Sequence, residues 1–165
     1  MALNTHNYEI AVHWTGNRGT GTSAYKAYGR DHTVTAAGLP SLLGSADRTF
    51  HGDRDRWNPE LLLVTALAQC HMLSYLHVAV LHGVVVTRYQ DAATGTMVMN
   101  PDGSGQFESV TLHPHVDVAD PATAELALTL HAEAAAKCFI ARSVNFPVHH
   151  EPGLLEREQT AQLPR

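Results

Sequence analysis

Apolar and polar residues alternate near the start of the chain, which is the pattern of half-buried β-strands. The alternation predicts strands at about residues 9–15, 23–28 and 32–37, with a turn at residues 29–31 between the last two. Residues 38–57 are rich in Gly, Pro, Ser and Asp, so we expect an ordered loop there.

A long apolar run after this loop predicts a central helix. Asn58 suits the N-cap, Pro59 suits the first helical position, and Glu60 complements the positive end of the helix dipole. The run is apolar on every side up to residue 81, and His82 and Gly83 then give a C-terminal signal. A helix of this kind is normally surrounded by protein. Its length approaches that of a membrane span, but polar residues interrupt it, which favours a buried core helix.

The remaining residues predict further strands and a second helix. The β-rich stretches 84–99 and 105–119 flank the turn sequence NPDGSG and should form a hairpin or neighbouring strands. A second helix is expected to open at Asp120-Pro121, and residues 146–152 suit a short last strand. Four residues of the second helix share one apolar face: Leu126, Leu130, Ala134 and Cys138.

This order of elements predicts an α+β fold with antiparallel sheets and two main helices, one of them long and buried. We expect a single domain over residues 1–152, followed by a polar C-terminal tail at 153–165.

Composition and charge exclude several functional classes. The 165 residues are 44% hydrophobic and 16% charged, which is typical of one folded domain. The formal charge of -5 and the lack of a Lys/Arg cluster argue against a nucleic-acid partner. Because no basic segment precedes an apolar one at the start, we expect no signal peptide, no membrane attachment and a cytoplasmic location.

Twelve histidines raise the possibility of a metal site, but their spacing does not support one. His71 and His77 would lie on different faces of the central helix, and His71 and His82 would be about 16 Å apart along it. The sequence contains no HExxH or CxxC motif and no GxSxG motif of serine hydrolases. We therefore expect no metal and no bound cofactor.

The remaining candidates for chemistry are Cys70, Cys138, Arg30 and Glu60. A thiol attacks as the thiolate, and burial alone opposes ionisation, whereas a nearby guanidinium stabilises the anion. A carboxylate could fix that guanidinium, and a second thiol could capture a sulfenic acid formed by peroxide attack. Each residue also has an ordinary structural explanation: a core thiol, a solvated arginine, or a glutamate at a helix start.

Three segments resemble the OsmC/Ohr superfamily of organic hydroperoxide reductases: GRDH at residue 29, RWNPELLLVTALAQCH ending at residue 71, and AKCFIARSVNFPV at the end of the second helix. The resemblance extends over nearly the whole chain. It implies that Cys70 is the peroxidatic thiol, Cys138 the resolving thiol, Arg30 the stabiliser of the thiolate, and Glu60 the partner of Arg30. Because Arg54 and Arg56 are close in sequence, they are alternative candidates for the role of Arg30.

The resemblance also implies partners and assembly. Members of the superfamily reduce organic hydroperoxides, are recycled by external dithiols such as lipoylated proteins, and form intertwined homodimers. The segment after Cys138 favours the OsmC branch or an uncharacterised subgroup over the Ohr branch. One continuous helix would separate Glu60 from Cys70 by about 15 Å. Either the helix begins several residues later and Glu60 precedes it in a loop, or a second subunit supplies the missing groups. The apolar character of the helix on every side favours the second, so we expect an obligate homodimer in which Cys70 and Cys138 come from one chain and Arg30, with or without Glu60, from the other. The alternatives are a non-catalytic member that binds a small apolar ligand and a structural domain with two incidental thiols.

Overall fold

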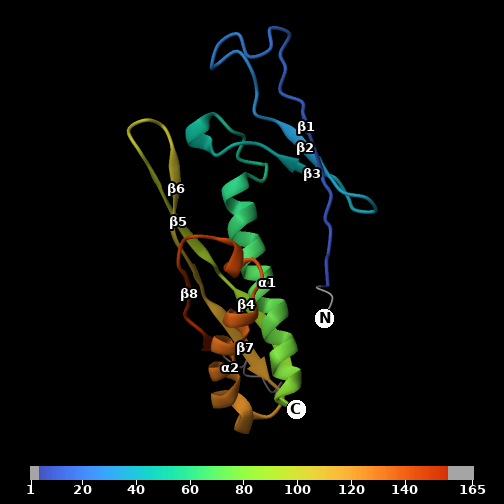
Figure 1. The fold of residues 1–165 in the computed structure, drawn as a ribbon, viewed down its shortest axis with the longest axis vertical. Helices are drawn as coiled ribbons and strands as arrows, with labels where there is room; N and C mark the ends of the chain where they lie inside the picture. The colour runs from blue at the N-terminus through green and yellow to red at the C-terminus, as the bar shows by residue number, and fades with distance from the viewer. Residues whose placement is uncertain (1–3, 156–165) are drawn as a thin grey trace, which may run out of the picture. The chain divides into compact units, whose positions relative to one another are not determined.

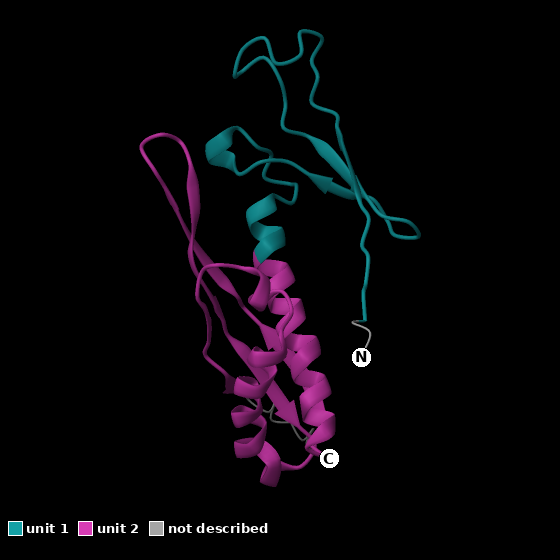
Figure 2. Ribbon diagram, viewed as in Figure 1, with its two compact units in different colours: residues 1–63 teal, residues 64–165 magenta. Residues whose placement is uncertain are grey.

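The structure is a computed structural model that describes residues 4–155. Nine strands and two α-helices follow one another in the order β1–β2–β3–α1–β4–β5–β6–β7–α2–β8–β9 within this range (Figure 1). The chain divides into two compact units, Met1–Leu63 and Val64–Arg165, and α1 begins in the first and continues in the second (Figure 2). An α+β fold is confirmed.

The first unit contains one antiparallel sheet with the order β1-β2-β3. Its strands are Ala11–Trp14, His32–Thr35 and Leu42–Gly44, and the 3-10 helix η1 follows at Arg48–Phe50. The first and third predicted strands are confirmed. The predicted loop at 38–57 is wrong in part, because it contains β3, whose Leu43 pairs with Thr33 of β2.

The strand predicted at residues 23–28 is wrong, because this stretch forms turns and bends. The side chain of Asn17 accepts hydrogen bonds from the N–H groups of Gly19 (2.9 Å) and Gly21 (3.1 Å). Both glycines have positive φ, at 103° and 57°. The turns that Asn17 and these two glycines form bend the backbone just before the predicted strand.

Helix α1 spans Pro59–Leu81, which confirms the predicted bounds. The Asn58 side chain accepts the Leu61 N–H at 2.8 Å and so caps the first turn. At the other end Gly83 has φ 71°, and the N–H of Val84 returns to the Ala79 carbonyl at 2.9 Å. By length and composition α1 could also cross a membrane, a property that it shares with core helices.

The second unit contains two three-stranded sheets, with the orders β4-β7-β9 and β5-β6-β8. The strands are β4 Val86–Asp91, β5 Thr94–Met99, β6 Gly105–Leu112, β7 Pro114–Val118, β8 Val148–His150 and β9 Gly153–Leu154. The β5–β6 hairpin is antiparallel, as predicted, and so is the β4–β7 pair.

The prediction of purely antiparallel sheets is wrong for the last two strands, since β8 pairs with β6 and β9 with β7 in parallel. Parallel pairing requires a long crossover connection, and α2 provides it in both cases. Strand β9 also occupies the first residues of the predicted tail. Residues 156–165 of that tail lie outside the described residues.

The second helix begins as predicted at Asp120, whose side chain accepts the Ala122 N–H at 2.9 Å. The first turn is the 3-10 helix η2, Pro121–Thr123, and α2 then spans Ala124–Lys137. Its predicted apolar face is confirmed for Leu130, Ala134 and Cys138, which are buried, but Leu126 is 41% exposed.

Among the described residues, every buried apolar side chain belongs to the second unit. One hydrophobic cluster joins α1, α2 and β7 around Tyr75, Ala127 and Val116. A smaller cluster joins α1 to β6 through Leu67, Val110 and Leu112. The first unit therefore has no hydrophobic cluster of its own within the described part of the chain.

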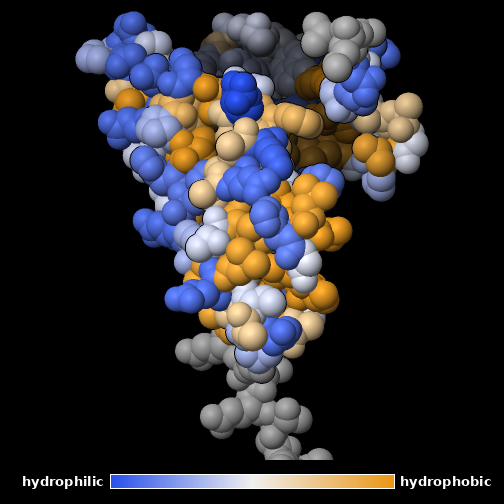
Figure 3. Space-filling view, turned by 60° about the horizontal axis from the view of Figure 1, so that its bottom comes forward, coloured by the Kyte–Doolittle hydropathy of each residue, from blue (hydrophilic) through white to orange (hydrophobic). Residues whose placement is uncertain are grey.

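Both units leave apolar side chains exposed (Figure 3). In the first unit Ile10, which directly precedes β1, and Val12 and Trp14 of β1 occupy alternate positions and are 60%, 57% and 45% exposed. In the second unit Leu73 and Val80 of α1 are 62% and 74% exposed. One chain alone does not surround α1 with protein on every side.

Candidate functional site

Two elements of the second unit bring the cysteines together. Cys70 is half-buried on α1, and Cys138 is buried at the C-terminal end of α2. Both are free thiols. The helices pack through the hydrophobic cluster around Tyr75 and Ala127, so residues far apart in sequence meet at this point.

A single turn after α2 contacts both sulfur atoms. The N–H of Ile140 donates to Cys70 Sγ at 3.4 Å, and the N–H of Ala141 donates to Cys138 Sγ at 3.5 Å. The 3-10 helix η3, Ala141–Ser143, continues the turn. These contacts place the two thiols at one site.

The two thiols have different surroundings. Burial, together with a hydrogen bond and charge repulsion from the neighbouring Cys70, raises the pKa of the Cys138 thiol to about 11. Cys138 therefore stays protonated at neutral pH. This asymmetry suits a site in which Cys70 reacts first and Cys138 follows as a thiol.

A cluster of buried histidines begins at the residue after Cys70. His71 of α1 shares a hydrogen bond of 2.9 Å with His131 of α2 through Nε2 and Nδ1, and both residues are almost fully buried. The ring of His150 on β8 lies 4.4 Å from that of His71, centroid to centroid. Tyr75 stacks on His131 at 3.9 Å.

These imidazoles are neutral at physiological pH. Burial lowers the pKa of His71 to about 3 and that of His131 to about 4, and repulsion from His150 contributes to both. The pKa of His150 is also lowered by burial. Sequence reasoning tested the histidines only as metal ligands and missed this cluster. The sequence did contain one signal for it: His71 and Tyr75 are four residues apart on an apolar helix, so their rings lie on the same face.

Arg30 lies in the first unit, where neighbouring residues hold its guanidinium. It donates to the carbonyl oxygens of Tyr28 at 2.7 Å and Tyr25 at 2.8 Å. The rings of the same two tyrosines face the guanidinium carbon, at 4.1 Å and 4.5 Å from their centroids. The planar cation is thus fixed by two carbonyls and two aromatic faces.

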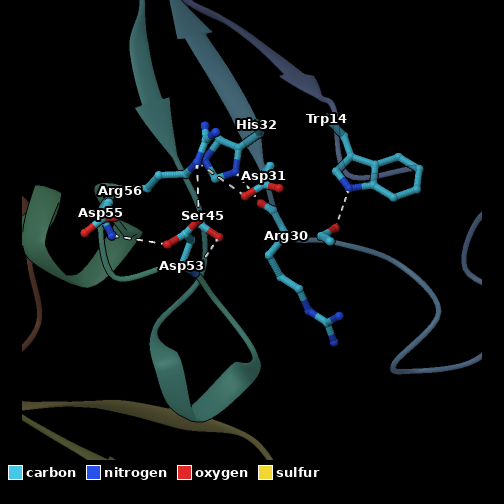
Figure 4. A network of polar contacts seen from close by, with 9 residues as sticks. Trp14, Arg30, Asp31, His32, Ser45, Asp53, Asp55 and Arg56 are labelled. Atoms are coloured by element: carbon cyan, nitrogen blue, oxygen red, sulfur yellow. Dashed lines mark hydrogen bonds and ion pairs between the residues drawn. The ribbon is translucent and has the colours of Figure 1, made fainter. Parts of the chain in front are cut away.

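Arg56, one of the alternatives to Arg30, is engaged elsewhere in the first unit. Its Nε lies 3.4 Å from Asp31 and 4.0 Å from Asp53. Figure 4 shows this network, with the side chain of Arg30 extending away from it. Arg54 lines a hollow of about 510 Å³ that Arg30 also lines, so Arg54 remains an alternative by position.

Glu60 lies in the first turn of α1, and its Oε2 is buried without a hydrogen-bond partner among the described residues. No ion pair joins Glu60 to Arg30 within the described part of this chain. The prediction that Glu60 fixes Arg30 therefore stays a prediction. Since α1 is one continuous helix from Pro59, the possibility that Glu60 precedes the helix in a loop is wrong.

No group of three or more His, Cys, Asp or Glu side chains in the described residues is arranged to hold a metal ion. In the histidine cluster, His71 Nε2 and His131 Nδ1 are bonded to each other. The chemistry available at the cysteine pair is that of the thiols and their hydrogen-bond donors.

Comparison with protein families gives a match that covers both cysteines. The sequence profile of the OsmC-like protein family matches residues 51–152, which is more than half of the chain. The matched range contains Glu60, Cys70 and Cys138, whereas Arg30 precedes it. Comparison with curated proteins found no match.

Solved structures with the same fold cover almost the whole chain. An OsmC-like protein of unknown function from Vibrio cholerae is 29% identical, with a TM-score of 0.76, and the match covers 90% of this chain and 99% of that one. The organic hydroperoxide resistance protein OsmC of Legionella pneumophila is 20% identical, with a TM-score of 0.66 and coverages of 94% and 100%. An organic hydroperoxide resistance protein of Elizabethkingia anophelis is 13% identical, with a TM-score of 0.67 and coverages of 94% and 100%.

Proposed function

Because this chain belongs to the OsmC-like protein family, we propose that it is a thiol-dependent peroxidase that reduces organic hydroperoxides. The observation that carries the proposal is the meeting of Cys70 and Cys138 on one turn, with Cys138 kept protonated by burial. Two similar structures are organic hydroperoxide resistance proteins, which supports the same chemistry.

The proposed reaction has three steps. The Cys70 thiolate attacks the outer oxygen of the hydroperoxide, the O–O bond breaks, and the alkoxide takes a proton and leaves as an alcohol. Cys70 is then a sulfenic acid. The sulfur of Cys138 attacks the sulfur of Cys70 as the Cys138 proton passes to the leaving hydroxyl, which gives a disulfide and water. An external dithiol, such as a lipoylated protein, reduces the disulfide and is itself oxidised to a disulfide.

Apolar side chains beside the thiols favour an organic substrate over hydrogen peroxide. Phe139 follows Cys138 directly and is 80% exposed, and Ile140, whose N–H contacts Cys70, is 36% exposed. An alkyl group can bury apolar area against these side chains, at about 25 cal/mol per Å², and hydrogen peroxide cannot.

The function is tested by comparing two oxidants on the reduced protein. We expect about one equivalent of an alkyl hydroperoxide such as cumene hydroperoxide to be consumed, with loss of both thiols to a Cys70–Cys138 disulfide. Stopped-flow measurements should give a faster reaction with the alkyl hydroperoxide than with hydrogen peroxide. The disulfide is identified by mass spectrometry of the non-reduced digest.

Equal rates with both oxidants would contradict the organic substrate class. No consumption of either oxidant would contradict the peroxidase. It would favour the alternative, a non-catalytic member of the family that binds a small apolar ligand.

We also propose that the active form is a homodimer. The first unit has no hydrophobic cluster among its described residues, and Ile10, Val12 and Trp14 in and just before β1 are exposed. In the second unit α1 leaves Leu73 and Val80 exposed. Exposed apolar surface on both units is what a second copy of the chain can cover. In the dimer, Arg30 and Glu60 of one subunit would act on Cys70 of the other.

Charged residues in place of the exposed Leu73 and Val80 of α1 should separate the subunits. Leu73→Glu together with Val80→Glu puts two carboxylates where apolar surface should be buried, so we expect a monomer at micromolar concentration. The measurement is sedimentation velocity. The matched control is Ala132→Glu, which places a charge on an exposed position of α2. A wild-type protein that is a stable and fully active monomer would contradict the dimer.

A further inference from the structure

The turn after α2 presents two successive backbone N–H groups to two different sulfur atoms. Ile140 donates to Cys70, 70 residues away in sequence, whereas Ala141 donates to Cys138, three residues before it. Within the described residues the N–H donors at these sulfurs are main-chain groups, and the Ile140 N–H also acts on Cys138, where it opposes the rise of the thiol pKa. A main-chain donor has no side-chain rotamers to order, so it is ready before the reaction begins.

Further hydrogen bonds fix the position of these donors. The N–H of Arg142 donates to the Cys138 carbonyl at 3.2 Å, and the N–H of Ser143 donates to the Ile140 carbonyl at 2.9 Å. The Ser143 hydroxyl donates to the Phe139 carbonyl at 2.8 Å. The turn is closed on itself by three bonds that do not involve either sulfur, so its shape does not depend on the state of the thiols.

A hydrogen-bond donor has a different role at each of the two sulfurs. A hydrogen bond to a charged acceptor is about twice as strong as one to a neutral acceptor, so the Ile140 N–H gains strength when Cys70 ionises. Cys138 is 1% exposed and keeps its proton until the second step. For disulfide formation, the sulfur of Cys138 must be held at a fixed distance and in a fixed direction from the sulfur of Cys70.

We infer that the Ile140 N–H stabilises negative charge on Cys70, and that the Ala141 N–H positions Cys138 for the step that forms the disulfide. The inference rests on the proposed function and names two main-chain groups for two of its steps. It also means that part of the thiolate stabilisation belongs to the same chain and the same unit as Cys70. Arg30 then adds to a stabilisation that is already present.

The Ile140 donor can be removed with little change to the backbone. The φ of Ile140 is -69°, close to the value of about -65° that proline requires, so Ile140→Pro deletes the N–H at a compatible angle. Ile140→Ala is the control, because it removes the same side chain and keeps the N–H. The measurement is the rate of Cys70 alkylation by iodoacetamide against pH, in a Cys138→Ser background.

We expect Ile140→Pro to slow alkylation about tenfold at pH 7 and to move the midpoint of the pH profile upward by about one unit. Ile140→Ala should leave the midpoint in place. If Ile140→Pro does not fold, replacing Ile140 by its α-hydroxy acid substitutes an ester oxygen for the N–H and keeps the side chain. The same change of the profile is expected.

The Ala141 donor is tested in the wild-type cysteine background with the α-hydroxy acid of alanine at position 141. We expect an unchanged rate of Cys70 oxidation and a several-fold slower appearance of the disulfide, with sulfenic acid trapped by dimedone in the interval. The two substitutions thus separate the first chemical step from the second. A purely structural role of the turn would slow both steps in both variants.

An α-hydroxy acid variant at position 140 that folds and has the wild-type alkylation profile would overturn the inference for Cys70. A variant at position 141 with wild-type disulfide formation would overturn it for Cys138. Because alkylation requires no hydroperoxide, a changed profile in a protein that consumes no hydroperoxide would contradict the proposed function and leave the role of Ile140 standing.

Discussion

Cys70→Ser is expected to abolish the consumption of organic hydroperoxide, with a rate decrease on the order of 10³-fold or more. The hydroxyl of serine does not ionise at neutral pH, so no strong nucleophile remains at this position of α1. Cys138 cannot take over the attack, because burial raises the pKa of its thiol to about 11 and keeps it protonated. The measurement is the loss of alkyl hydroperoxide after mixing with the reduced variant.

Cys138→Ser is the matched control, since it removes the other thiol by the same atom change. We expect this variant to consume one equivalent at the wild-type rate in a single turnover. It should then stop as a sulfenic acid on Cys70 that dimedone traps. Wild-type rates in Cys70→Ser would show that another group attacks the peroxide, and the mechanism would be wrong.

Acid should destabilise the second unit strongly, because its core contains neutral histidines. The pKa of His71 is lowered to about 3 and that of His131 to about 4, whereas an unfolded histidine titrates near 6.5. Between these values the unfolded chain binds more protons than the folded one. The free energy of unfolding therefore falls as the pH drops from about 6.5 toward 3.

At pH 5 each of the two histidines should cost about 2 kcal/mol relative to neutral pH. His150 adds to this loss because burial lowers its pKa as well, whereas burial raises the pKa of the nearby Asp91. A carboxyl group with a raised pKa binds its proton more readily in the folded state, so Asp91 offsets part of the loss below its own folded pKa. The measurement is urea unfolding at pH 7.5 and pH 5.0.

The variants for this test remove the titrating rings from the core. His71→Phe with His131→Phe should flatten the dependence of the free energy of unfolding on pH, even if the variant is less stable at both pH values. His149→Gln is the control, because His149 is exposed and next to His150 in sequence. Equal stability of the wild type at the two pH values would contradict the assignment of neutral buried imidazoles.

The sequence by itself determined the features that depend on local chemistry. Asn58, Pro59 and Gly83 mark the ends of α1 because capping and positive φ are properties of single residues and their nearest neighbours. The turn sequence before β6 likewise placed the β5–β6 hairpin. Family membership was also available from motif spacing around Cys70 and Cys138, and the family comparison confirms it.

Only the tertiary structure decided which distant residues meet. The parallel pairing of β8 and β9 depends on where α2 returns the chain, which no local pattern contains. The contact of Ile140 with Cys70 and the hydrogen bond between His71 and His131 join residues 70 and 60 positions apart. An exposed solvated histidine and a buried neutral one have the same letter in the sequence. Their difference arises from the desolvation that packing of α1 against α2 imposes.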